Sequence, residues 1–359
     1  MTFTVIGTPG DRRTELFAAA CRSAGADAPT VVPWSDVLRG GAVRVEPGTM
    51  LRIDSPGEDP EADALLRGEG DPSRVGGGAR WYRTFTAALG RIACAGARAG
   101  GRALNDVGDI AVMFDKRLCH ARLQSAGVPV PGALPDVDGY AALRERMECT
   151  GFRRVFVKPA HGSSASGVIA LQTAPNGRIK AVTSAAPGPG GGYVNSLRVR
   201  AYESEPEVAA LIGALAPDGL HVERWVPKAA LNGRSLDLRV VVIAGEPTHA
   251  VVRTSRSPMT NLHLGGARGD LGAVRAALGE RGWRGALDAC ARAAACFPGS
   301  LMVGVDLLVE TGWRRVAVGE VNAFGDLLPG LTGLPGGAAE GLDTYTAQVR
   351  AALSEKLPA

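Results

Sequence analysis

Two apolar runs near the end of the chain each carry a single acidic residue, and this pattern constrains the fold more than any other. Residues 304–309 read GVDLLV and residues 318–322 read VGEVN. Carboxylates are almost never buried among apolar side chains without a partner. If the two runs are paired strands, Asp306, Glu320 and Asn322 can converge as oxygen ligands for one or two Mg²⁺ ions. The alternative is a buried carboxylate bonded to a cationic side chain or to the backbone.

The chain has 359 residues, more than one hydrophobic core usually organises, so we expect two or three subdomains. Residues 1–105 alternate β-branched runs with helical stretches, which predicts an open α/β domain. A central segment is placed at 106–218 and a C-terminal segment at 219–359, both mixing helices with strands. The predicted fold class is therefore α/β followed by α+β, with a cleft between the layers.

A lysine at the end of a predicted strand precedes a loop of small residues. Residues 155–168 read VFVKPAHGSSASGV, in which Lys158 comes before a loop from Gly162 to Gly167. Such a loop lets backbone N–H groups and hydroxyls approach phosphate oxygens, and lysine adds a compact positive charge. The lysine precedes the glycines, so the pattern is not a Walker loop. It favours phosphate binding, with a plain hairpin and a Ser-rich turn as the alternative.

Two further stretches lie between these signals. Residues 236–243 read LDLRVVVI, and alternation places Asp237 and Arg239 on one side of a strand, where Arg253 of the next strand can join them. The planar fork of arginine suits a phosphate or an acyl phosphate. Upstream, residues 221–227 read HVERWVP and end a strand with a carboxylate and an aromatic ring, as an adenine slot requires. Solvated arginines and an edge strand with a core tryptophan are the alternatives.

Composition gives no support to several other classes of protein. The six cysteines form no CxxC pair, so neither a zinc site nor a disulfide framework is indicated. The net charge is +4, and the arginines are spread along the chain, so we expect no nucleic-acid partner. With no apolar run long enough to span a bilayer and no export signal, we expect no membrane partner and a cytoplasmic protein.

Taken in order, these elements resemble the ATP-grasp superfamily, and within it the RimK-type glutamate ligases and relatives of D-alanine–D-alanine ligase. The resemblance covers residues 105–330 and rests on D-K, G-V-P, the strand lysine with its loop, E-R-W-V, D-L-R, T-N-L-H-L-G-G, G-V-D-L-L and E-V-N. It implies an ATP-grasp fold preceded by a pre-ATP-grasp domain. It also implies an ATP-dependent carboxylate–amine ligase that acts through an acyl phosphate and releases ADP and phosphate.

The resemblance further implies roles for individual residues. Contacts to the ATP phosphates are implied for Lys116, Lys158, Gly162, Ser163, Ser164 and Gly167. Adenine or ribose contacts are implied for Glu223, Trp225, Val226 and Asp237. Stabilisation of the transferring phosphoryl group is implied for Arg239, Arg253 and Asn261. Coordination of two Mg²⁺ ions, with Mn²⁺ as a substitute, is implied for Asp306, Glu320 and Asn322.

The implied partners are a small-molecule or peptide carboxylate and an amine-type acceptor, and a homodimer is compatible with this picture. The S-P-G that usually follows E-V-N is replaced by Phe324, Gly325 and Asp326, which reshapes the wall where ligases commonly place the amine. Arg52 and Arg256 are candidates to hold the carboxylate of an amino-acid acceptor. Two other functions stay open, a small-molecule kinase of this fold and an ATP-binding protein without turnover.

Overall fold

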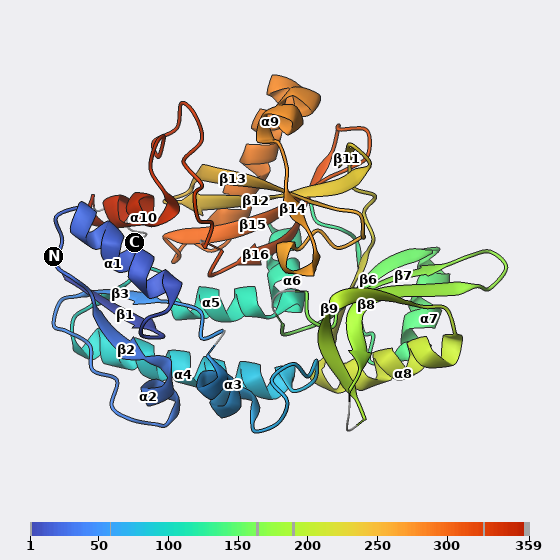
Figure 1. Ribbon diagram of the computed structural model, residues 1–359, viewed down its shortest axis with the longest axis horizontal. Coiled ribbons are helices and arrows are strands. Elements are labelled where there is room, and N and C mark those ends of the chain that lie inside the picture. The colour runs from blue at the N-terminus through green and yellow to red at the C-terminus, as the bar shows by residue number, and fades with distance from the viewer. Residues whose placement is uncertain (1, 58, 163–164, 189–190, 326, 355–359) are drawn as a thin grey trace.

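The computed structural model describes residues 2–57, 59–162, 165–188, 191–325 and 327–354. The described residues form three β-sheets (Figure 1). The N-terminal sheet is parallel, the middle sheet is antiparallel, and the third sheet is also antiparallel. The predicted mixture of an α/β layer with α+β layers is therefore confirmed.

The N-terminal sheet has the strand order β2-β1-β3-β4. Its strands are β1 (Phe3–Gly7), β2 (Thr30–Pro33), β3 (Met50–Ile53) and β4 (Arg102–Ala103). Its helices are α1 (Arg12–Ser23), α2 (Trp34–Leu38), α3 (Pro60–Arg67) and α4 (Gly78–Arg98). Asp11 caps α1 by accepting a hydrogen bond from the backbone N–H of Arg13. The loops after β1 and β3 leave the carboxyl ends of parallel strands, where ligand-binding loops are commonly found.

The middle sheet has the strand order β5-β10-β6-β7-β8-β9. Its strands are β5 (Ala133–Leu134), β6 (Arg154–Pro159), β7 (Ile169–Thr173), β8 (Ile179–Pro187), β9 (Tyr193–Tyr202) and β10 (Leu220–Arg224). Helices α7 (Tyr140–Thr150) and α8 (Glu205–Leu215) supply Leu143, Val208 and Leu211 to the buried cluster beneath these strands. The other face of the sheet is thus left to face the rest of the molecule.

The third sheet has the strand order β14-β13-β12-β15-β16, with β11 paired to β12. Its strands are β11 (Ala230–Leu231), β12 (Arg234–Ile243), β13 (Glu246–Ser255), β14 (Ala267–Arg268), β15 (Met302–Val309) and β16 (Val316–Asn322). Helix α9 (Leu271–Ala295) packs on one face, where Leu238 and Val240 are fully buried with Trp283. Alternation along β12 then turns Asp237 and Arg239 to the opposite face.

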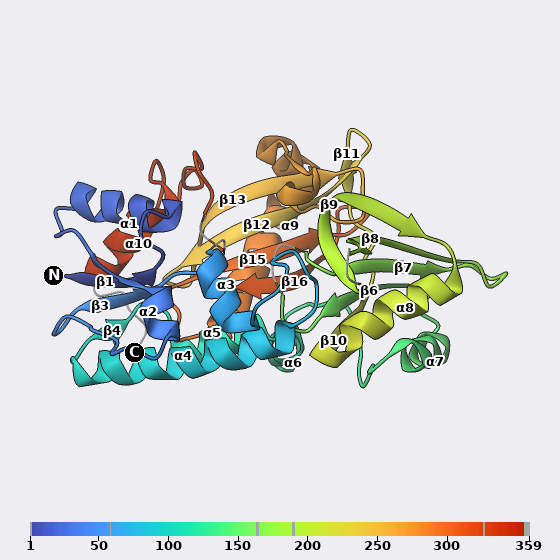
Figure 2. The same ribbon diagram turned by 60° about the horizontal axis from the view of Figure 1, so that its bottom comes forward.

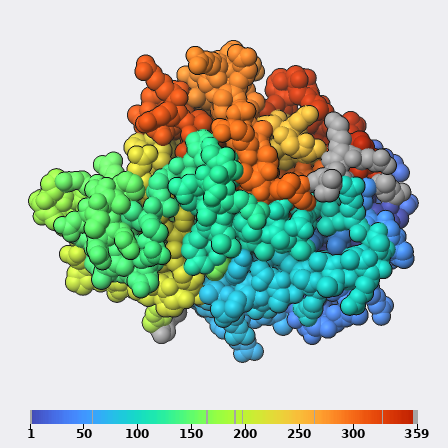
Figure 3. Space-filling view, turned by 180° about the vertical axis from the view of Figure 1, so that it is seen from behind, coloured from blue at the N-terminus to red at the C-terminus, as the bar shows by residue number. Residues whose placement is uncertain are grey.

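Helices α5 (Val107–Phe114) and α6 (Lys116–Ser125) join the three sheets. Seen from behind, they lie across the centre of the surface, between the green elements of the middle sheet and the orange elements of the third (Figure 3). Figure 2 shows α4 running beneath the N-terminal sheet toward the middle one. There the Asp218 carboxylate accepts hydrogen bonds from the backbone N–H groups of Gly77 and Ala79, at 2.5 and 3.0 Å. These contacts fix the N-terminal layer against the middle sheet.

Two elements lie in a different layer from the segment that the sequence assigned to them. Strand β10 follows residue 218 but pairs with β5 and β6 in the middle sheet. Helix α10 (Thr344–Leu353) returns to the N-terminal layer, where Tyr345 and Val349 pack with Phe3 and Phe17 (Figure 1). The segment boundaries 1–105, 106–218 and 219–359 stay a prediction. In the described part of the chain, no helix has both the length and the apolar character needed to cross a membrane.

Aromatic rings of α4 pack against rings of neighbouring elements in a buried cluster. Phe85 is fully buried, with its ring centroid 5.6 Å from Trp34, 4.8 Å from Trp81 and 4.9 Å from Phe114. Phe85→Ala should lower the free energy of unfolding by about 3–5 kcal/mol, because it removes a large ring from a packed core. Arg83→Ala, an exposed position on the same helix, should change it by less than about 0.5 kcal/mol. Denaturant titration measures both, and equal effects would contradict the packing described.

Candidate functional site

A cavity of about 720 Å³ lies where the three layers meet. Its walls include parts of the N-terminal layer, α6, the middle sheet and the third sheet. The predicted site residues that line it are Lys116, Lys158, Gly162, Glu223, Val226, Asp237, Arg239, Arg253, Asn261, Asp306, Glu320 and Asn322. Most of the predicted set is therefore brought to one place by the fold.

The register of the third sheet gathers the charged groups on the face turned away from α9. Asp306 on β15 lies directly opposite Glu320 on β16 and Arg239 on β12. Asp237 on β12 lies directly opposite Arg253 on β13. Neighbouring side chains on one face of a sheet are close enough to interact. Five charged side chains thus form one continuous patch on the cavity wall.

Asp306 is held between two arginines. Arg239 donates hydrogen bonds to both carboxylate oxygens, and the Arg253 Nη2 atom lies 3.1 Å from Asp306 Oδ1. Burial alone would raise the pKa of Asp306, but the positive charges of Arg239 and Arg253 hold it well below its usual range. The carboxylate is therefore ionised across the physiological range, as a metal ligand must be.

Asp237 is the second buried carboxylate of the patch. It accepts a hydrogen bond of 2.8 Å from Arg253 Nε, one of 3.4 Å from Lys228 Nζ and a short one from the Thr260 hydroxyl. Burial would raise the pKa of Asp237, but Arg253 and Lys228 lower it. Both oxygens of Asp237 thus have partners within the protein, and the carboxylate fixes the arginine that also contacts Asp306. The implied ribose contact stays a prediction.

Two lysines approach the cavity from different elements. Lys116, at the start of α6, has its Nζ atom 2.9 Å from Glu320 Oε1 and donates a 2.6 Å hydrogen bond to the Gly162 carbonyl. Lys158 Nζ lies 2.6 Å from Glu223 Oε1. Burial alone would raise the pKa of Glu223, but the nearby Lys158 ammonium lowers it to about 2. Each lysine is therefore positioned by a carboxylate that itself lines the cavity.

The oxygen-rich corner formed by Asp306, Glu320 and Asn322 fits a hard divalent cation. Asn322 uses its side-chain N–H in a 3.2 Å hydrogen bond to the Gly304 carbonyl, so its oxygen is the atom suited to coordination. The corner offers two carboxylates and one amide oxygen, a donor set that Mg²⁺ and Mn²⁺ prefer. A cation bound there would share Glu320 with Lys116.

Some predicted residues lie away from the cavity or outside the described residues. Trp225 does not line the cavity, and its ring packs on Phe156 with the centroids 5.3 Å apart. The adenine contact implied for the backbone of Trp225 stays a prediction. Gly167 does not line the cavity either; with φ at 68° it forms a turn against Pro159. Ser163, Ser164 and Asp326 lie outside the described residues.

The suggestion that Arg52 binds an acceptor carboxylate is wrong. Arg52 is buried, bonds to Asp54 through its Nε and Nη2 atoms at 2.8 and 2.7 Å, and donates a short hydrogen bond to Gln348. It therefore fixes α10 on the N-terminal layer instead of facing the cavity. Arg256 is exposed and does not line the cavity either.

Other cationic side chains line the cavity without having been predicted from the sequence. They are Arg13, Lys228 and Arg268. Arg13 lies in the first turn of α1, and its Nη1 atom donates a 3.4 Å hydrogen bond to the carbonyl of Phe324. The turn after β1 is the sequence feature that could have predicted a ligand-binding role for Arg13, because loops at the carboxyl ends of parallel strands often bind ligands.

The departure from S-P-G has a packing reason at Gly325. A Cβ atom on Gly325 would lie 2.6 Å from the Cα atom of Gly304, closer than real Cβ atoms approach backbone. The preceding residue, Phe324, lines the cavity and its ring lies 5.5 Å from Phe114. The residues after β16 thus form an aromatic wall pressed against β15.

Solved structures resemble this chain over nearly its whole length, whereas no family model and no curated protein match its sequence. The D-cycloserine synthetase DcsG is 18% identical with a TM-score of 0.59, covering 98% of this chain and 99% of its own. The ATP-grasp ligase PsnB, complexed with minimal precursor, Mg and ADP, is 17% identical with a TM-score of 0.52, covering 99% and 98%. This chain has the ATP-grasp fold.

A third solved structure is similar in fold to this chain. The N5-carboxyaminoimidazole synthase from Aspergillus clavatus, in complex with ADP and an aminoimidazole ribonucleotide, is 14% identical with a TM-score of 0.52. The match covers 100% of this chain and 78% of that one. These likenesses support the ATP-grasp fold and its N-terminal layer. They do not single out the RimK type within it.

The second prediction tests the buried network around Asp237. Asp237→Asn should lower the free energy of unfolding at neutral pH by about 3 kcal/mol, because it leaves Arg253 and Lys228 buried without their carboxylate. The pKa of Asp237 is lowered in the folded protein from its ordinary 3.8. Its contribution to stability is therefore present above pH 3.8 and is lost as the pH falls through the folded-state pKa.

The free energies of unfolding of wild type and variant should therefore become more similar as the pH falls below 3.8. Asp288→Asn is the matched control, because Asp288 is exposed on α9 and forms an ion pair with Arg292 across the helix surface. It should change stability by less than about 0.5 kcal/mol. An Asp237 variant as stable as this control would contradict the network.

Proposed function

We propose that this protein is an ATP-dependent ligase that joins a carboxylate to an amine or a related nucleophile. The reaction would pass through an acyl phosphate and release ADP and phosphate. The proposal is carried by one observation, that a single cavity is lined by a set of cationic side chains together with the Asp306, Glu320 and Asn322 corner. The cations used here are Lys116, Lys158, Arg239 and Arg253. PsnB, which is described as a ligase, shares the fold and was solved with Mg and ADP.

The nucleotide is assigned to the part of the cavity between the middle and third sheets. Its apolar lining comes from Phe156, Val226, Met259 and Leu308, which suits an adenine ring. Lys116 and Lys158 lie nearby and supply positive charge for the phosphates. Gly162 also lines the cavity, and its carbonyl accepts a hydrogen bond from Lys116. ATP is thus the co-substrate that the chemistry of the walls favours.

Asp306, Glu320 and Asn322 would hold two Mg²⁺ ions, or Mn²⁺ in their place. When bound, such ions neutralise charge on the phosphate oxygens during phosphoryl transfer. The protein's own contribution is to hold both carboxylates in register and to keep Asp306 ionised. Arg239 and Arg253 achieve this for Asp306, since they lower its pKa despite its burial.

The reaction balances in two steps. A substrate carboxylate oxygen attacks the γ-phosphorus in line, which forms an acyl phosphate and ADP. The nucleophile then attacks the acyl carbon, and phosphate leaves with the electron pair of the broken C–O bond. Arg239, Arg253 and Asn261 line the cavity where the transferred group would lie. Their donors would stabilise negative charge on it, while the walls orient the reactants and exclude water.

The two substrates are assigned to the end of the cavity nearest the N-terminal layer. Arg13, Ser55, Gly57, Phe324 and Leu328 line this end, together with Arg268 from β14. Arginines favour an anionic substrate, so a small-molecule or peptide carboxylate would bind here beside an amine-type acceptor. The Phe324 ring would give this end an apolar wall.

The third prediction tests the activity. Purified protein with ATP and Mg²⁺, supplied with pools of carboxylates and amines, should release ADP only when both a carboxylate and a nucleophile are present. Glu320→Gln should lower this rate by about 10²-fold or more, because it removes charge from the metal corner and frees Lys116 from its ion pair. A coupled assay for ADP measures both proteins.

Glu246→Gln is the matched control, because Glu246 is an exposed residue at the start of β13 in the same sheet. It should leave the rate unchanged. ADP release with a single substrate and a stable phosphorylated product would replace the ligase with a kinase. Turnover that survives Glu320→Gln unaltered would show that the metal corner is placed wrongly.

A further inference from the structure

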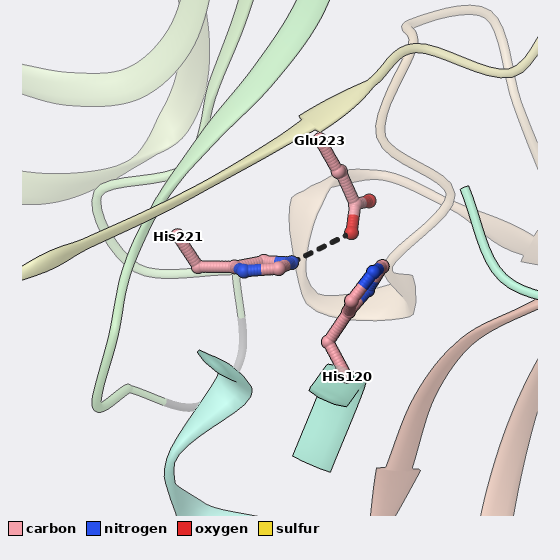
Figure 4. A group of neighbouring side chains, drawn as sticks. All are labelled: His120, His221 and Glu223. Atoms are coloured by element: carbon pink, nitrogen blue, oxygen red, sulfur yellow. Dashed lines mark hydrogen bonds and ion pairs between the residues drawn. The ribbon is translucent and has the colours of Figure 1, made fainter. Parts of the chain in front are cut away.

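A second group of metal-ligating side chains lies next to the part of the cavity that Lys116 and Lys158 line. His120 on α6 and His221 and Glu223 on β10 each offer one ligand atom, and these three atoms lie within 4.8 Å of one another. Both imidazole rings point toward the Glu223 carboxylate (Figure 4). Among the residues that the structure describes, this is the one such group of three. It is distinct from the Asp306 corner, with which it shares no residue.

The cluster is buried and incompletely bonded. His120, His221 and Glu223 are 8%, 6% and 3% exposed. His221 Nε2 lies 3.1 Å from Glu223 Oε2, whereas His120 Nε2 has no hydrogen-bond partner among the described residues. Buried polar atoms are nearly always satisfied, so an unpartnered ring nitrogen directed at a carboxylate calls for an occupant. A small cavity of about 10 Å³ lies beside the cluster. It is lined by His120 and His221 but not by Glu223, and also by Lys116, Lys158 and Glu320.

The donor atoms define the kind of occupant. A neutral imidazole can bind a metal ion through its unprotonated ring nitrogen, and His120 and His221 each bring one such ring to the cluster. Two imidazole nitrogens with one carboxylate oxygen suit zinc and similar transition metals, while Mg²⁺ prefers oxygen ligands throughout. The ring of His120 lies 5.0 Å from that of His221 and is tilted by 51°, so the two nitrogens approach from different directions.

We propose that His120, His221 and Glu223 form a binding site for a transition-metal ion of the zinc class. The site is coupled to the nucleotide end of the cavity, because Glu223 presents one oxygen to His221 and the other to Lys158 at 2.6 Å. A metal ion bound to this carboxylate would weaken the attraction between Glu223 and the Lys158 ammonium. The ammonium in turn repels the ion, so the ion binds reversibly and more weakly than at a closed structural zinc site.

The fourth prediction is a metal titration that needs no substrate. Metal-stripped full-length protein, without nucleotide, is titrated with Co²⁺ while its visible d–d absorption is followed, and Zn²⁺ is then added to displace it. Wild type should bind one equivalent with the spectrum of a nitrogen- and oxygen-ligated ion, distinct from the spectrum of any ion held by the all-oxygen Asp306 corner. His120→Phe, which keeps an aromatic ring but has no nitrogen, should weaken binding by about 100-fold or more, because it removes a ligand.

Two controls separate this site from its surroundings. Glu320→Gln removes charge from the proposed Mg²⁺ corner and should keep the Co²⁺ spectrum. His161→Phe replaces another buried histidine, one stacked on Tyr82 at 4.0 Å, and should also keep it. Zn²⁺ should raise the melting temperature of wild type and of both controls, and leave that of folded His120→Phe unchanged.

Failure of wild type to bind Co²⁺ or Zn²⁺ would overturn the proposal whatever the variants do. It would also be overturned if folded His120→Phe, checked by circular dichroism, bound the ion as tightly as wild type. Loss of binding in Glu320→Gln alone would show that the ion sits at the Asp306 corner instead. None of these outcomes depends on the ligase activity, so this inference can fail while the proposed function stands.

Discussion

The ion pairs that hold Asp306 between Arg239 and Arg253 are the interaction on which the rest of the site depends. A lone carboxylate on a buried strand would be costly to ionise, and breaking such a pair leaves an uncompensated charge. Because Arg253 is itself held by Asp237, the charges form a chain across three strands. That chain fixes the register of β12, β13 and β15 and keeps Asp306 ionised. The metal corner follows from it, since Glu320 is the register partner of Asp306 on the next strand.

A second pair, Lys158 with Glu223, plays the same part in the middle sheet. Both groups are buried, and each shifts the pKa of the other toward the charged form, Lys158 upward and Glu223 downward. The two sheets therefore present oppositely charged partners toward one cavity, with Lys116 from α6 linking Glu320 to the Gly162 carbonyl. A nucleotide entering this space would meet cations that are already positioned, which reduces the entropy lost on binding.

The sequence predicts the third sheet and its charges well, for a local reason. A single acidic residue in an apolar run must find a partner, because an unpaired buried carboxylate is costly. Strand alternation then fixes the face on which Asp306, Glu320 and Asn322 must lie. Contacts between distant segments are harder to anticipate. Arg52 was assigned to a substrate, yet it bonds to Gln348 nearly 300 residues later. His120 and His221 carry no spacing signal, because they belong to elements that are far apart in the chain, α6 and β10, and meet only in the folded structure. Likewise, β10 looks like the start of the third segment, and only its pairing with β6 reveals where it lies.

The central claim is that nucleotide and metal meet at the cavity between the middle and third sheets. A crystal structure of the protein with ADP and Mg²⁺ tests it most directly, because it needs no knowledge of the substrates. We predict that Lys116 and Lys158 contact the ADP phosphates and that Asp306, Glu320 and Asn322 coordinate the metal. Nucleotide bound elsewhere on the molecule, or metal that touches none of these three side chains, would contradict it.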